Sequence, residues 1–211
     1  MAIVQMSIHR ALGELKTLDA RIIQGMNCDF VKANKKSNDK IGGKTVDEFK
    51  VAIKGNLDSV TKLIENQKVI KAGIVASNAV TKVTIGGKVY TVADAIERSK
   101  LIRHEEDLLV TLKTQYARQR KQVEDENNAL PEKLEKYLQS VLGDKSQRSA
   151  EDIERYTKDF EARNKYDLID PCKIEDYIKK LELDITTFKG EVDYILSESN
   201  ATTYIEVDLG D

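Results

Sequence analysis

Apolar residues recur along most of this sequence in alternating steps of three and four. An early run repeats every seven residues at Ile8, Leu15 and Ile22. The most regular run comes late, at Ile174, Ile178, Leu181, Ile185, Phe188, Val192 and Ile195. This period places apolar side chains on one helix face, where they pack against another helix. Only two prolines, Pro131 and Pro171, interrupt the chain. The sequence therefore predicts a mainly α protein, built as a long antiparallel helical hairpin or coiled-coil bundle.

The period changes between residues 80 and 92, where β-forming residues flank Gly86-Gly87. Both central residues of a type I′ turn need a positive φ, so this pattern predicts a β-hairpin. Helix-capping patterns begin the helices on either side, Thr45-Val46-Asp47-Glu48 for the first and Thr91-Val92-Ala93-Asp94 for the second. Because a tight turn reverses the chain, we expect these two helices to run antiparallel, as an arm with the hairpin at its tip.

Shorter segments complete the expected domain organisation. Residues 29–44 are polar and predict a mobile loop, and residues 131–169 predict an insertion of short helices. Asp170-Pro171 is typical of a helix start, with Asp as N-cap and Pro at the first helical position. The alternating pattern over 202–211 predicts a C-terminal β-strand that adds to the hairpin, within the subunit or in a neighbour. We expect all of 1–211 to form a single elongated helical domain.

Composition narrows the classes of partner. Charged residues make up 33% of the chain, but the net charge is −2, whereas a dedicated nucleic-acid-binding protein normally has a clear basic excess. We interpret the lysines at 35, 36, 40 and 44 as part of a solvated loop, with phosphate contact as the less favoured alternative. No stretch approaches the roughly 20 apolar residues of a membrane span, and the start lacks a signal-peptide pattern. We expect a chain made in the cytoplasm, with reduced cysteines and with neither nucleic acid nor membrane as a partner.

Candidate residues for chemistry are few. His104 and Asp107 have the spacing of metal ligands on a helix, but two residues do not make a site. Gly42-Gly43-Lys44-Thr45 ends like a phosphate-binding loop, yet the earlier glycine of such a loop is missing and no buried strand leads into it. The serines and cysteines have no nearby histidine to activate them. We therefore predict no catalytic residue, metal or cofactor, and a protein that is not an enzyme.

Two stretches, taken in their order, point to a family. One runs from Ser77-Asn78-Ala79 through Gly86-Gly87 to 90–98, and the other from Asp170-Pro171 to 199–202. They resemble a family of uncharacterised helical proteins of Gram-positive bacteria and their phages. The resemblance covers about half of the chain and carries over no catalytic residue. It implies helical hairpins with a β tip that oligomerise.

These features lead to an expected function. We expect a structural, non-enzymatic protein that oligomerises with itself and with other structural proteins. The expected setting is a phage or prophage particle, in its capsid, neck, tail or baseplate, which would place the protein in the virion. The alternative is a cytoplasmic coiled-coil adaptor or regulator of bacterial or phage origin. Strand edges invite pairing with other chains, so the expected interaction residues are Gly86, Gly87, Tyr90, Tyr204, Ile205 and Val207.

Overall fold

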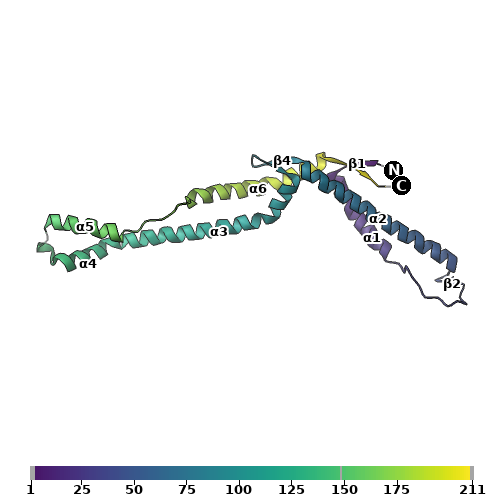
Figure 1. Cartoon of the computed structure of the whole chain (residues 1–211), viewed down its shortest axis with the longest axis horizontal. Coiled ribbons are helices and arrows are strands. Elements are labelled where there is room, and N and C mark those ends of the chain that lie inside the picture. Colours follow the sequence, from purple (N-terminus) through teal and green to yellow (C-terminus); the bar gives the residue numbers. More distant parts are fainter. Residues whose placement is uncertain (1–2, 148, 210–211) are drawn as a thin grey trace. The chain divides into compact units, whose positions relative to one another are not determined.

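The computed structural model describes residues 3–147 and 149–209 (Figure 1). Of the described residues 73% are helical, which confirms the mainly α fold class. Its elements, in order, are β1 (Ile3–Ser7), α1 (Ile8–Met26), β2 (Lys40–Ile41), β3 (Lys44–Thr45), α2 (Val46–Val80), β4 (Lys82–Ile85), β5 (Lys88–Thr91), α3 (Val92–Asn128), α4 (Leu130–Leu142), a 3-10 turn (Lys145–Gln147), α5 (Ala150–Asn164), α6 (Ile174–Thr202) and β6 (Tyr204–Asp208). The strands form three separate two-stranded antiparallel sheets.

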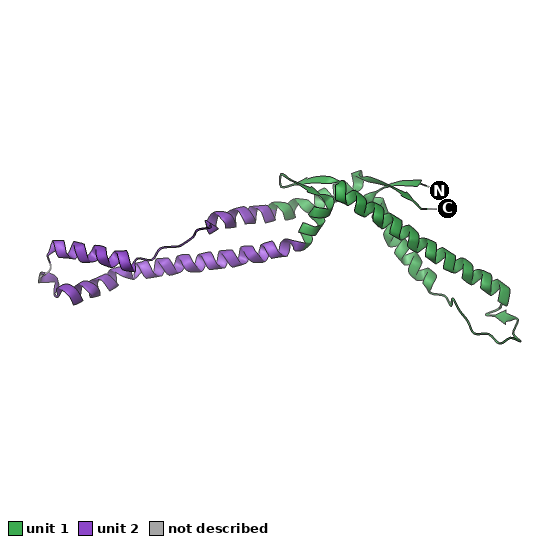
Figure 2. Ribbon diagram, viewed as in Figure 1, with its two compact units in different colours: residues 1–100, 187–211 green, residues 101–186 purple. Residues whose placement is uncertain are grey.

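The chain divides into two compact units (Figure 2). Unit 1 comprises Met1–Lys100 and Thr187–Asp211, and unit 2 comprises Leu101–Thr186. The boundary passes through α3 and α6, which both continue across it. The sequence predicted one elongated domain over 1–211, whereas the contacts cluster separately within these two parts.

In unit 1 the helix α2 packs along α1. The two run antiparallel: Ile8, at the start of α1, shares a core cluster with Ile74 near the end of α2. At the other end, the Asn56 amide of α2 donates to the Gly25 carbonyl of α1 at 3.1 Å. The sequence predicted the helix after the hairpin as the partner of α2. The helix that packs along α2 in unit 1 is instead α1, because its heptad stripe supplies the apolar face that α2 needs.

The C-terminal strand of unit 1 lies within the same subunit. Strand β6 pairs antiparallel with β1, with Ile3 opposite Asp208 and Ser7 opposite Tyr204. The predicted strand is therefore confirmed over Tyr204–Asp208, with 210–211 outside the described residues, but its expected pairing with the 80–92 hairpin is wrong. The sheet packs on α2 at Gly73, where an added Cβ would lie only 3.1 Å from Val207. A glycine at this position lets the strand approach the helix closely.

In unit 2 the segments of α3 and α6 are joined by polar contacts. The Tyr116 hydroxyl donates to Glu175 at 2.8 Å, and Lys113 pairs with Glu182 at 2.6 Å. The predicted short-helix insertion over 131–169 consists of α4 and α5, which pack through aromatic rings. Tyr137 contacts Tyr156 and Phe160, with ring centroids 6.4 and 5.1 Å away.

Helix α6 starts later than Asp170-Pro171 predicted. Its first residue is Ile174, because Lys173 has a positive φ of 51° and cannot belong to the first helical turn. Pro171 and Cys172 occupy a turn before the helix rather than its first positions. Asp170 still caps the start, since its carboxylate accepts a hydrogen bond from the Ile174 N–H at 2.8 Å.

Candidate functional site

The β4–β5 hairpin forms where Gly86-Gly87 predicted it. Both glycines have positive φ, 57° and 72°, as a type I′ turn requires. Ile85 lies opposite Lys88 beside the turn, and Lys82 lies opposite Thr91 at the base. Thr91 then caps α3, accepting from the Asp94 N–H at 3.0 Å. The predicted hairpin and helix cap are therefore confirmed.

This hairpin is seated on the part of α6 that belongs to unit 1. The Gly86 N–H donates to the Glu191 carboxylate at 2.7 Å, and a Cβ built on Gly86 would lie 3.1 Å from Thr187 Cγ2. Further along, the Tyr90 ring meets Phe188 edge-on, with centroids 5.8 Å apart. Phe188 is among the most deeply buried side chains described, at 2% exposure. The turn amide, the glycine surface and Tyr90 together dock the hairpin onto one helix face.

Arg98 of α3 completes the packing around this aromatic pair. Its guanidinium lies 4.4 Å from the centre of the Phe188 ring and donates to the Tyr90 hydroxyl at 2.5 Å. A cation over a ring face is attracted by the ring quadrupole. The contact links the first turns of α3 to both the hairpin and α6.

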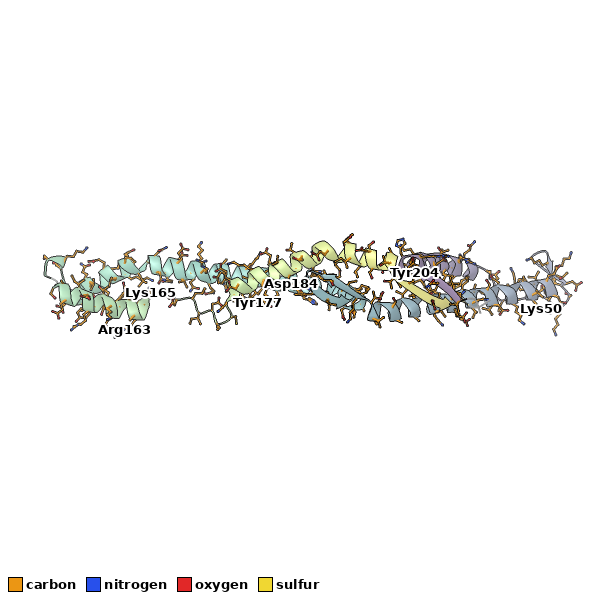
Figure 3. All side chains as sticks on the ribbon, turned by 90° about the horizontal axis from the view of Figure 1, so that it is seen from above. Lys50, Arg163, Lys165, Tyr177, Asp184 and Tyr204 are labelled. Carbon is orange, nitrogen blue, oxygen red and sulfur yellow. The ribbon has the colours of Figure 1, made fainter. Side chains whose placement is uncertain are left out.

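The six residues predicted to interact with partners lie in different surroundings. Gly86 and Tyr90 are brought together by the contact with α6, whereas Gly87 faces open space. Ile205 and Val207 are buried, at 6% and 3% exposure, in the core cluster of unit 1. Tyr204 is 61% exposed, so among the three predicted residues of the C-terminal strand it is the one whose side chain lies at the surface (Figure 3).

A second Gly-Gly hairpin lies inside the segment predicted as a mobile loop. Strands β2 and β3 flank Gly42 and Gly43, whose φ values are 57° and 85°. Ile41 lies opposite Lys44, as Ile85 lies opposite Lys88 in the longer hairpin. The signal that could have revealed it is the repeated sequence Ile-Gly-Gly-Lys, at 41–44 and 85–88. The flanking polar residues obscured it, because each strand has only two residues.

The two hairpins have the same base as well as the same turn. In each, a lysine lies opposite the threonine that caps the next helix, Lys40 with Thr45 and Lys82 with Thr91. The valine after each threonine donates its N–H across the base, from Val46 to the Asp39 carbonyl at 3.2 Å and from Val92 to the Thr81 carbonyl at 2.9 Å. The β2–β3 hairpin therefore matches the β4–β5 hairpin, with two residues fewer in each strand.

The turns of the two hairpins differ in what covers them. No described atom lies within 4 Å of a Cβ built on Gly42 or Gly43, in contrast to the contact between Gly86 and Thr187. Lys40 and Lys44 are strand residues of this hairpin, Lys35 and Lys36 precede it in the sequence, and all four are exposed. Within the described ranges none of the four forms an ion pair. The β2–β3 turn is therefore open, and the segment 35–45 has a net positive charge, with four lysines against one acidic residue, Asp39.

The capping box of α2 is the clearest local electrostatic feature near this hairpin. The Glu48 carboxylate accepts from the Thr45 N–H at 2.8 Å and from its hydroxyl at 3.0 Å. These hydrogen bonds, assisted by the charge of Lys44, lower the pKa of Glu48 below its usual range. In unit 2, the hydrogen bond to Glu175 raises the pKa of the Tyr116 hydroxyl.

Over 3–147 and 149–209, no group of three or more His, Cys, Asp and Glu side chains is arranged to hold a metal ion. In the same ranges, none of the helices combines the length and apolar character needed to cross a membrane. A scan of protein-family models finds no match, and neither do searches of curated proteins and of solved structures. The candidate site is therefore defined by its geometry, as a pair of related hairpins on a helical protein.

Proposed function

We propose that this chain is a structural, non-enzymatic protein that oligomerises through the helices of unit 2, as a component of a phage or prophage particle. The observation that supports oligomerisation is the balance of buried and exposed apolar side chains in unit 2. Among its described residues four hydrophobic side chains are buried, Ile102, Leu138, Ile178 and Ile185. Eight large hydrophobic or tyrosine side chains are exposed: Leu101, Leu108, Val110, Val141, Tyr166, Ile169, Tyr177 and Leu183.

So few buried side chains give a helical unit little intrinsic stability. Helices in proteins derive most of their stability from tertiary packing of an apolar face rather than from propensity. Leu101 and Leu108 are seven residues apart, so they lie on the same face of α3, and they are 55% and 43% exposed. Tyr177 of α6 is likewise exposed, at 47% (Figure 3). A neighbouring subunit that covered such a face would add the missing burial, at about 25 cal/mol for each Å² of apolar surface.

The particle setting rests on the sequence resemblance to helical proteins of Gram-positive bacteria and their phages. A particle component needs surfaces for repeated contacts rather than a catalytic centre. Long charged helices with exposed heptad positions fit that need, but they also occur in adaptors, and fold alone does not assign function. The setting therefore calls for an experiment separate from the test of oligomerisation.

Oligomerisation is tested by light scattering on the purified chain over a range of concentrations. We expect a mass of at least twice the 23.8 kDa of one chain. Leu108→Glu should lower that mass, because it places a charge on the exposed apolar face. Thr114→Glu is the matched control, since it adds the same charge at an exposed polar position elsewhere on α3. A monomer at every concentration, or equal effects of the two variants, would contradict this part of the proposal.

The particle setting is tested by mass spectrometry of purified phage particles from a host that carries this gene. We expect the chain at a fixed ratio to known particle proteins, together with neighbouring genes for particle assembly. Its absence from particles, combined with recovery in a stoichiometric complex with a cytoplasmic protein, would support the adaptor alternative instead.

A further inference from the structure

We propose that the β2–β3 hairpin is a docking surface for an acidic helix of another polypeptide, which would seat on Gly42 as α6 seats on Gly86. This surface lies in unit 1, and the inference does not depend on the proposed oligomerisation through unit 2. It assigns a binding role to a segment that the sequence alone presents as a polar loop.

The first support is the use that the chain already makes of the same hairpin. Around Ile-Gly-Gly-Lys at 85–88, the turn presents an N–H to a carboxylate and a glycine surface to the methyl group of Thr187. The residues of the turn recur at 41–44, with positive φ at both glycines and the same Ile–Lys cross-strand pair. The backbone that contacts the helix in one hairpin is therefore present in the other.

The second support is that the matching surface of β2–β3 is open. A Cβ on Gly42 would meet no described atom within 4 Å, whereas the corresponding atom on Gly86 would press on a helix at 3.1 Å. A Gly-Gly turn needs only positive φ, which Asn-Gly also supplies. Glycine at the first position has an additional use where a helix approaches closely, as at Gly86.

The third support is charge, which indicates the kind of helix that would bind. Lys40 and Lys44 belong to the hairpin strands, Lys35 and Lys36 precede them in the sequence, and all four are exposed. Opposite charges across an interface favour encounter and discriminate against wrong partners. On α6 the residues that receive the hairpin are Thr187 and Glu191, four apart and so on one helix face. The expected partner helix therefore has a net negative charge and presents a small β-branched residue one turn before a glutamate.

A peptide from this chain is a direct probe of the surface. Residues 180–199 contain Thr187, Phe188 and Glu191, and the peptide has two lysines against five acidic residues. Binding of a fluorescein-labelled peptide to the intact chain is measured by fluorescence anisotropy. We expect saturable binding, at least tenfold weaker when the peptide carries Glu191→Gln. Equal binding of a scrambled peptide would show attraction by charge alone and would overturn the inference.

Two variants of the turn give the decisive comparison. Gly42→Asn keeps a type I′ turn, because Asn-Gly is the favoured pair, but places a side chain on the docking surface. Gly43→Asn adds the same side chain at the position that, in the longer hairpin, faces open space at Gly87. We expect Gly42→Asn to weaken peptide binding at least tenfold and Gly43→Asn to change it less than twofold, with unchanged circular dichroism for both.

Other results would overturn the inference in recognisable ways. If the peptide replaced the chain's own α6, binding would respond to Gly86→Asn and not to Gly42→Asn. Equal loss in Gly42→Asn and Gly43→Asn would mean that the turn is not the contact. Leu108→Glu, which tests oligomerisation through unit 2, should leave peptide binding unchanged, so failure of either proposal is distinguishable from failure of the other.

Discussion

Replacing Gly86 by asparagine tests how closely the β4–β5 hairpin is seated on α6. Asparagine tolerates a φ of 57°, so the substitution adds little backbone strain. Its Cβ would lie 3.1 Å from Thr187 Cγ2 and 3.7 Å from Thr187 Cβ. The first distance is closer than ordinary van der Waals contact, so either the hairpin or the threonine must move.

The expected cost follows from these distances. Over-packing in a well-packed site costs about 1–3 kcal/mol. Displacing the turn would also lengthen the 2.7 Å hydrogen bond from Gly86 to Glu191, and a typical hydrogen bond contributes about 0.5–1.5 kcal/mol. Because this bond is exposed, we expect a combined loss of about 1–2 kcal/mol in the stability of the hairpin. Gly87→Asn should change it by less than about 0.5 kcal/mol, since nothing lies within 4 Å there.

Hydrogen exchange of the hairpin amides is the appropriate assay, since two units need not unfold in one transition. Exchange of residues 82–91 should accelerate in Gly86→Asn and remain near wild type in Gly87→Asn. Thr187→Ala should restore protection in the double variant, because it removes Cγ2 and leaves only the 3.7 Å contact. Equal protection in the two single variants, or no rescue by Thr187→Ala, would refute the proposed close seating.

Three further predictions concern other parts of unit 1. Phe188→Ala should lower the free energy of unfolding of unit 1 by about 3–5 kcal/mol, in urea titrations that follow unit 1 separately by hydrogen exchange, because it empties a buried site beside Tyr90; a loss below 1 kcal/mol would contradict that packing. Ile205→Asp should cost several kcal/mol in the same titrations, whereas Tyr204→Asp, at an exposed position, should change stability by about 0.5 kcal/mol or less; similar losses would argue against the register of β6. The pKa of Glu48 is lower in the folded chain than in the unfolded chain. The stability that its carboxylate adds to the α2 N-terminus is therefore fully present above the ordinary carboxyl range and is lost as the pH falls through the lower folded-state pKa. Hydrogen-exchange protection at the α2 N-terminus, corrected for the intrinsic exchange rate at each pH, should therefore fall in acid in the wild type but not in Glu48→Gln, which keeps an acceptor for the Thr45 N–H.

Features set by neighbouring residues could be predicted from the sequence. The turn at Gly86-Gly87 depends on φ at two positions, and the Thr45–Glu48 capping box spans four residues. Both were predictable because the conformation and its cause lie in the same short segment. The apolar stripes likewise predicted helices, because alternating steps of three and four residues match the 3.6-residue turn of an α-helix.

Features set by distant contacts could not be predicted. Strand β1 was missed because its partner, β6, lies at the other end of the chain and only their pairing makes 3–7 a strand. The partner of α2 was misjudged because a heptad stripe shows that a helix packs without showing on what. The seat of the hairpin depends on Thr187 and Glu191, which lie about one hundred residues beyond it and match no motif.

The pairing of β1 with β6 has a consequence for how the chain folds during its synthesis. Ile3 and Asp208 are neighbours in the sheet but are separated by 205 positions, the difference between their residue numbers. At roughly 5–20 residues per second, the ribosome needs about 10–40 s to add that length. Throughout that interval Met6 and Ile8, both buried in the folded structure, lack the strand that covers them. Strand β1 thus gains its partner late, and unit 1 closes only after the whole of unit 2 has been translated.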